Sequence, residues 1–219
     1  MKFLAAFLLM ALIAAPVAAR QSEAVKIVTL GTSLTARGGW QEPLRRALSA
    51  CRDGEVTVVN LARSGMASDW GLTQIDKALA ERPNVVLVEF AINDAALNRF
   101  LSLKESGANV EEIVTRLKAG ESRPVIHVMA MSPVSGLRGM IRPFLGQYEE
   151  LHAEIARRLG VGFIDHRPAW AALSADELAT AIADGAHPDP ETASRVMLPG
   201  LLRALAGPNC PAARTEASG

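Results

Sequence analysis

Five short apolar segments separated by longer amphipathic ones are the feature of this sequence that most limits its fold. The apolar segments are rich in β-branched residues and nearly unbroken by polar ones, as strands buried on both faces of a parallel sheet are. Their lengths suit strands better than helices. We therefore expect strands at residues 25–30, 56–60, 84–90, 124–130 and 161–164.

Between these strands, apolar residues recur every three or four positions, which is the period of an amphipathic helix. Strands that alternate with helices within one domain are typical of a doubly wound α/β fold. We expect a flavodoxin-like three-layer α/β/α sandwich around a mostly parallel five-stranded sheet. The clearest helical stripes are Trp40, Leu44, Ala47, Leu48 and Cys51; Val110, Ile113, Val114 and Leu117; and Tyr148, Leu151, Ile155 and Leu159.

The start of the chain has the pattern of a secretory signal peptide. Lys2 is followed by an apolar run at residues 3–15, then by Pro16 and small residues at 17–19. The run is shorter than the ~20 residues that span a bilayer. We expect cleavage after residue 19, export to the periplasm or the medium, and no stable membrane insertion afterwards. The alternatives are an uncleaved anchor or a first helix of the fold. Residues 20–207 are then long enough for one well-buried domain, and residues 208–219 are expected to form a flexible tail.

Composition argues against a nucleic-acid partner. The chain has 23 basic and 23 acidic residues, and only Lys2 leaves with the signal peptide, so the mature charge is 22 − 23 = −1. A nucleic-acid surface would show a basic stripe with stacking aromatic residues, and the chain has one tyrosine.

Cys51 and Cys210 form no zinc pattern. In an oxidising compartment they pair, and otherwise they are two unrelated thiols. The oligomeric state is left open.

Polar residues cluster just after the predicted strands, where ligands of open α/β sheets bind. Ser33 follows the first strand, Gly65 lies beyond the second, and Asn93 follows the third. Asp184 and His187 lie in one turn before the last helix. Parallel strands end at one edge of the sheet, so these segments are expected to converge there.

Each of these residues has a role in acyl transfer. A serine hydroxyl becomes a useful nucleophile when a nearby base takes its proton, so Ser33 is the candidate nucleophile and His187 its base. Asp184 would fix the tautomer of His187 and stabilise its charged form. The backbone N–H groups of Ser33 and Gly65 and the amide of Asn93 would stabilise the oxyanion. The hypothesis needs no cofactor and no metal.

Four segments in order resemble the blocks of the SGNH/GDSL hydrolases: GTSL around Ser33, the glycine at 65, AIND ending in Asp94, and DGAHP from Asp184. The resemblance implies an ester hydrolase in which Ser33, Gly65, Asn93 and His187 carry the four named roles, with Asp184 as the acid. Thr32 stands where the family usually has aspartate, and we expect a local change in hydrogen bonding there. Ala91 replaces a glycine, and its methyl group would crowd the oxyanion site or narrow the substrate range.

The substrate expected by analogy is a small-molecule or polysaccharide ester, with short acyl groups on carbohydrate favoured. The alternatives are a lysophospholipase or thioesterase for longer chains, a non-catalytic carbohydrate-binding module on the same scaffold, and a flavin or nucleotide carrier. The carrier is disfavoured because the first turn lacks a glycine-rich phosphate cradle.

Several other polar residues near this edge are open to two interpretations. Asp165–His166 competes with Asp184–His187 for the base role, although a structural or rim role is favoured. His152 is expected at the surface of a helix. Arg138 and Arg142, in a long connection at residues 131–146, would meet an anionic substrate or stay solvated.

Overall fold

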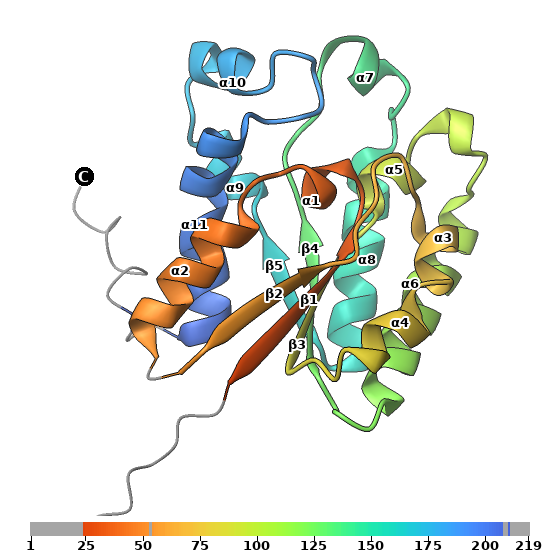
Figure 1. Ribbon diagram of the computed structural model, residues 1–219. Helices are drawn as coiled ribbons and strands as arrows, with labels where there is room; N and C mark the ends of the chain where they lie inside the picture. The colour runs from red at the N-terminus through yellow and green to blue at the C-terminus, as the bar shows by residue number, and fades with distance from the viewer. Residues whose placement is uncertain (1–23, 53, 208–209, 211–219) are drawn as a thin grey trace, which may run out of the picture.

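A computed structural model describes residues 24–52, 54–207 and 210, and its sheet is fully parallel (Figure 1). The strand order is β2-β1-β3-β4-β5. Ile27 of β1 lies beside Val58 of β2 and Val85 of β3. The five predicted strands are confirmed to within a residue or two, at β1 (Val25–Gly31), β2 (Val56–Asn60), β3 (Val85–Glu89), β4 (Val125–Ala130) and β5 (Gly162–Asp165).

Helices cover both faces of the sheet, which makes the predicted three-layer sandwich (Figure 1). Successive strand residues point to opposite faces, so Ile27 packs into one apolar cluster and Val28 into the other. One cluster is completed by α2 (Gln41–Cys51), α9 (Arg167–Ala171) and α11 (Pro190–Ala206). The other is completed by α3 (Ser68–Leu72), α4 (Ile75–Ala80), α6 (Leu103–Ala119) and α8 (Leu145–Leu159).

Short helices gather above the carboxyl ends of the strands (Figure 1). The long connection expected at 131–146 contains the helical turn α7 (Gly136–Met140), and the segment between β3 and α6 contains two more, α5 (Ala91–Asp94) and η1 (Leu97–Arg99). Because the chain passes from β1 to β2 on one side and then to β3 on the other, the carboxyl ends of β1 and β3 form the switch point where ligands of such sheets bind. The other short elements are α1 (Ser33–Ala36) and α10 (Ala175–Ala181).

A disulfide joins the end of α2 to the segment after α11. Cys51 and Cys210 are bonded, with their Cα atoms 5.2 Å apart. The structure thus favours pairing over two unrelated thiols. The predicted signal peptide lies outside the described residues, as does nearly all of the predicted tail. Within the described part of the chain, no helix combines the length and apolar character needed to cross a bilayer.

Replacing Cys51 by serine is expected to lower the free energy of unfolding by about 2–5 kcal/mol, because the bond spans a sequence separation of 159 residues and restricts the unfolded chain. Urea unfolding measures the loss. Cys210→Ser and wild-type protein in reductant should lose the same amount, since all three lack the same bond. A loss in Cys51→Ser that reductant does not reproduce would instead assign the effect to local packing.

Candidate active site

The turn after β1 holds Ser33 in a fixed place. Thr32 caps α1, with its hydroxyl accepting a hydrogen bond from the backbone N–H of Leu34. This leaves Ser33 as the first helical residue, with only 9% of its surface exposed. A capped turn of this kind presents the serine hydroxyl at the sheet edge while its backbone is held.

Glu89, at the end of β3, anchors this turn from below. Its carboxylate accepts hydrogen bonds from the Thr32 backbone N–H at 2.6 Å and from the Thr35 hydroxyl at 2.7 Å. The Thr32 hydroxyl also lies 3.0 Å from it. An aspartate at position 32 would bring a second carboxylate to this buried group, whereas threonine brings a donor. Glu89 was not among the residues expected at the site. The sequence signal that could have indicated it is a single acidic residue at the end of an otherwise apolar strand.

Glu89 is 1% exposed, and burial raises the pKa of its carboxyl to about 7, although hydrogen bonds from Thr35 and Thr32 act to lower it. The ordinary value is 4.5. Between these values the folded protein holds a proton that the unfolded chain releases. The stabilisation from this group is therefore greatest below about pH 4.5, and it is lost as the pH rises towards 7.

Glu89→Gln removes this titration while keeping an oxygen acceptor for Thr32. The free energy of unfolding of the wild type minus that of the variant is expected to fall by roughly 2–3 kcal/mol as the pH rises from about 4 to about 8. Urea unfolding across this range measures it, and other titrating groups cancel in the difference. A difference that stays constant or rises would contradict a buried carboxyl that holds its proton.

The turn before α11 presents Asp184 and His187 together. One carboxylate oxygen of Asp184 accepts hydrogen bonds from the backbone N–H groups of Ala186 at 2.9 Å and His187 at 2.7 Å. Gly185 between them has a φ of +79°, a conformation that glycine adopts without strain. A Cβ there would also lie 2.6 Å from the carbonyl oxygen of Ser135. The turn therefore fixes the backbone that carries the imidazole.

The two turns meet through the imidazole of His187. Its Nδ1 lies 2.6 Å from the second carboxylate oxygen of Asp184, and its Nε2 lies 2.8 Å from the hydroxyl oxygen of Ser33. Partial burial would raise the pKa of Asp184, but the hydrogen bonds from the His187 ring and from the two backbone N–H groups hold it well below its ordinary value. An ionised Asp184 accepts from Nδ1, which leaves Nε2 free to accept the Ser33 proton.

The proposed oxyanion donors line one cavity with Ser33 and His187. This cavity has a volume of about 260 Å³, and Gly65 and Asn93 form part of its wall. Gly65 has a φ of +78°, which glycine tolerates. The Asn93 amide nitrogen donates one hydrogen to the Met66 carbonyl at 2.8 Å. None of the described residues accepts a hydrogen bond from its second N–H, which is therefore left for a ligand. All five residues predicted for the site therefore come together.

Ala91 does not crowd this cavity, contrary to one of the two effects expected of it. It is 5% exposed, it belongs to the apolar core, and it does not line the cavity wall. The short helix α5 turns its methyl group into the protein and carries Asn93, two residues later, to the site.

A second cavity also has Ser33 and His187 in its wall. Its volume is about 380 Å³. Its wall combines the polar catalytic candidates with the apolar side chains Leu34, Met131, Ala181, Ala193 and Met197. Ser33, His187 and Arg37 line both cavities, so the two parts of an ester bound at Ser33 could occupy one cavity each.

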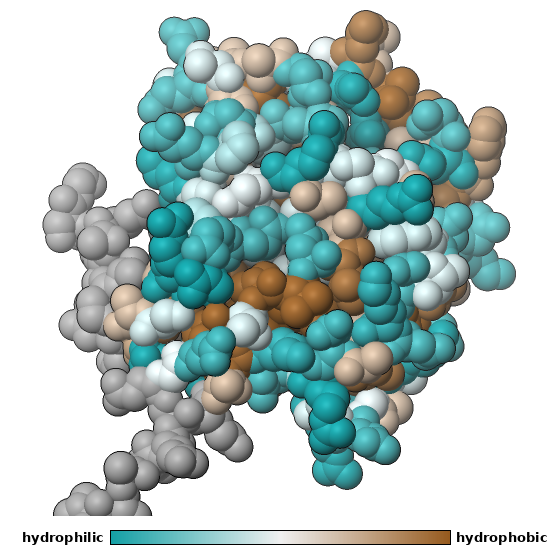
Figure 2. Space-filling model, in the orientation of Figure 1, coloured by the Kyte–Doolittle hydropathy of each residue, from teal (hydrophilic) through white to brown (hydrophobic). Residues whose placement is uncertain are grey.

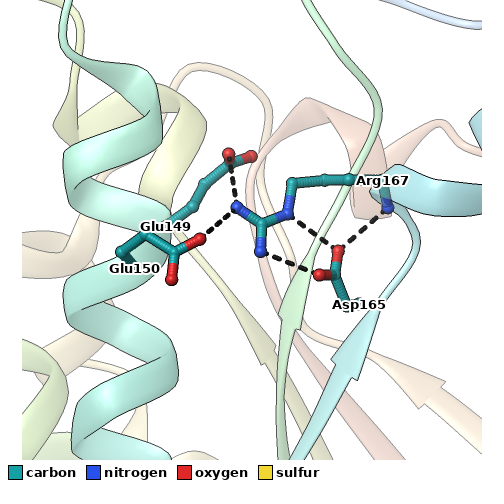
Figure 3. A network of polar contacts seen from close by, with 4 residues as sticks. All are labelled: Glu149, Glu150, Asp165 and Arg167. Carbon is teal, nitrogen blue, oxygen red and sulfur yellow. Dashed lines mark hydrogen bonds and ion pairs between the residues drawn. The ribbon is translucent and has the colours of Figure 1, made fainter. Parts of the chain in front are cut away.

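The rival pair Asp165–His166 lies away from the Ser33 site, which fits the structural role favoured for it. Figure 3 shows Asp165 facing Arg167, whose guanidinium Nε and Nη2 donate to it at 2.8 Å each, while Glu149 and Glu150 of α8 approach the same guanidinium. His166 is 1% exposed, and burial lowers its pKa to about 4. Neither residue lines the two cavities beside Ser33.

The expectation that His152 lies at the surface is wrong. It is 1% exposed, and its Nε2 lies 2.8 Å from the hydroxyl of Ser106, which in turn donates to Asp94 at 2.6 Å. Position 152 is four residues after Tyr148 and so shares its buried stripe. A polar partner on α6 permits a histidine there. Asp94 also accepts from the backbone N–H of Ser68 at 2.8 Å, so this buried network ties α5 to the helices behind it.

A doubly wound parallel sheet that presents a serine, a histidine and an aspartate in hydrogen-bonded series at its switch point is the architecture of an SGNH-type hydrolase. The chain belongs to the GDSL-like lipase/acylhydrolase family, whose model matches residues 29–194. The matched range contains every candidate site residue. The family resemblance is thereby confirmed, and the chain is a hydrolase of the class that acts on ester bonds.

Solved structures of several hydrolases share this fold. A lipase/acylhydrolase from Enterococcus faecalis superposes with a TM-score of 0.71 at 22% identity, covering 84% of this chain and 96% of that one. An acetylxylan esterase from Geobacillus stearothermophilus gives 0.70 at 20% identity, covering 82% and 93%. A hydrolase from the metagenome of Lake Arreo, Spain, gives 0.71 at 18% identity, covering 84% and 95%. No curated protein matches the sequence significantly.

Proposed function

We propose that this protein is an exported serine esterase that cleaves short-chain O-acyl groups, acetyl above all, from carbohydrate. The observation that carries the proposal is the series of contacts from Asp184 through His187 to Ser33, at 2.6 and 2.8 Å. Such a series activates a serine hydroxyl for attack on an ester carbonyl.

The reaction begins when Ser33 Oγ forms a bond to the carbonyl carbon and its proton passes to Nε2 of His187. The oxyanion accepts hydrogen bonds from the backbone N–H groups of Ser33 and Gly65 and from the amide of Asn93. Collapse of this intermediate breaks the bond to the alcohol, which leaves with the proton from His187. Water then gives a proton to His187 and attacks the acyl carbon. The bond from this carbon to Ser33 Oγ breaks, His187 returns the proton to Oγ, and the acid is released.

Two observations support a short acyl group and export. The acetylxylan esterase with the same fold acts on an acetylated polysaccharide, as its name states. Disulfides persist in oxidising compartments, which fits Cys51–Cys210 and the signal-like start of the sequence.

A lysophospholipase or thioesterase is the second candidate, and an exposed apolar rim favours it. Leu97 and Phe100, in and just after η1, are 55% and 91% exposed, and Leu137 and Met140 of α7 are 80% and 72% exposed. Figure 2 shows apolar surface at the upper right of the molecule, where α7 lies in Figure 1. A rim of this kind is suited to a long acyl chain or a lipid surface.

Hydrolysis of p-nitrophenyl esters from acetate to decanoate, by residues 20–219 and by Ser33→Ala, tests the proposal. Turnover that depends on Ser33 and is fastest with acetate is the expected result. A maximum at long chains would transfer the proposal to the lipid or thioester candidate. Folded protein without activity on any ester would leave a carbohydrate-binding role on this scaffold as the better explanation.

A further inference from the structure

The cavity that holds the oxyanion donors is bordered by four arginines. Arg37 ends α1, Arg99 ends η1, Arg138 lies in α7, and Arg142 follows α7. None of the described residues that line this cavity is an aspartate or a glutamate. Four arginine residues therefore line a space that also has Ser33 in its wall.

Arg142 is the buried member of the group. It is 9% exposed, and its guanidinium donates to the carbonyl oxygens of Ile92 at 2.6 Å and Arg138 at 2.9 Å, and to the side-chain oxygen of Asn93 at 3.3 Å. These partners are neutral, and no carboxylate of the described residues lies within 4.0 Å of it. A guanidinium has five N–H donors, so two are left.

The positive charge is concentrated here, and none of the four arginines forms an ion pair with a carboxylate of the described residues. Burial lowers the pKa of Arg142, and the charges of Arg138 and Arg99 lower it further, so these two cations are close enough to repel Arg142. Elsewhere on the surface, Arg45, Arg158 and Arg167 each pair with a carboxylate. The chain as a whole has a formal net charge of zero, so the cluster does not reflect a generally basic protein. Repelling cations around a cavity are stabilised when an anion enters it.

We propose that the substrate of this esterase carries an anionic group, a carboxylate or a sulfate, that binds in the arginine-lined cavity. The inference rests on the proposed function and narrows its substrate to an acylated acidic sugar. Guanidinium groups bind both anions through paired hydrogen bonds. The apolar side chains of the second cavity would then contact the uncharged part of the ester.

Acetate release from matched sugars tests the inference. The substrates are O-acetylated methyl glucuronoside, O-acetylated methyl glucoside 6-sulfate and neutral O-acetylated methyl glucoside. We expect kcat/KM at low salt to be at least about tenfold higher for an anionic substrate than for the neutral one, because each charged hydrogen bond contributes that order of selectivity. The two anionic sugars distinguish a carboxylate site from a sulfate site. Added salt should reduce the preference, because three of the four arginines are exposed.

The double variant Arg99→Gln/Arg138→Gln should lose most of the preference, by about tenfold or more. These two residues are chosen because they do not hold Asn93, as Arg142 does. Arg157→Gln/Arg203→Gln is the matched control. It also removes two positive charges, from exposed arginines on α8 and α11 that line neither cavity, and it should keep the preference.

Equal kcat/KM for all three sugars, unchanged in the double variant, would overturn the inference and leave the esterase proposal standing. If no sugar ester is cleaved, calorimetric titration of Ser33→Ala with methyl glucuronoside, methyl glucoside 6-sulfate and methyl glucoside still decides it. Binding of either anionic sugar alone, lost in the arginine variant, would support the anion site without the esterase. Equal binding of all three, or none, would overturn it.

Discussion

Replacement of His187 by alanine is expected to lower kcat/KM for a short-chain ester by about 10⁴-fold or more. Without the imidazole, no described group lies within hydrogen-bond distance of the Ser33 hydroxyl to take its proton. Loss of the nucleophile or of the base alone costs about as much as loss of all three members of such a series. Initial rates with p-nitrophenyl acetate measure the change. His187 is partly exposed in a surface turn, so the fold should survive, and thermal unfolding checks this.

A double variant sharpens this expectation. His187→Ala/Asp184→Asn should be no slower than His187→Ala alone, because Asp184 acts on the reaction only through the imidazole that it orients. An additional large loss would show that Asp184 contacts the substrate or the nucleophile directly. Activity near that of the wild type in His187→Ala would remove this residue from the base role.

Asn93→Ala is expected to lower kcat by about 10²–10³-fold with a small change in KM. Asn93 lines the cavity beside Ser33, and the amide N–H that Met66 does not use would donate to the oxyanion, which is present only after attack on the carbonyl. Steady-state kinetics separate kcat from KM. Asn109→Ala is the matched control, because it removes an amide that donates to Ser68 and lies outside both cavities.

An equal loss of activity in Asn109→Ala would assign the effect of Asn93→Ala to general disturbance of the fold. A rise in KM at constant kcat would show that Asn93 binds the ground state and contributes no selective stabilisation of the transition state.

The sheet was predictable because each strand carries its own local signal. Residues buried on both faces leave an unbroken apolar run, and the parallel register then brings all the carboxyl ends to one edge. That placement was enough to bring Ser33, Gly65, Asn93, Asp184 and His187 together before any distance was known. The signal peptide stays a prediction, since its residues lie outside the described part of the chain.

Features that depend on contacts between distant segments were harder to predict. His152 reads as a surface residue until Ser106, 46 positions earlier, is seen to provide its partner. Glu89 reads as the polar end of a strand, yet it anchors the turn that carries the nucleophile. Arg138 and Arg142 were open to two interpretations, because sequence alone does not show whether an arginine meets a carboxylate or a cavity.

Covalent labelling by a fluorophosphonate tests most directly whether Ser33 is the activated nucleophile. Attack by Ser33 Oγ on phosphorus would form a P–O bond and expel fluoride, and the series from Asp184 to His187 would accelerate it. Intact-mass measurement and peptide mapping should find one adduct per chain, on Ser33, absent in Ser33→Ala and much slower in His187→Ala. Folded wild-type protein that takes no label, or takes it at another residue with Ser33→Ala reacting equally fast, would contradict the assignment of Ser33 as the nucleophile.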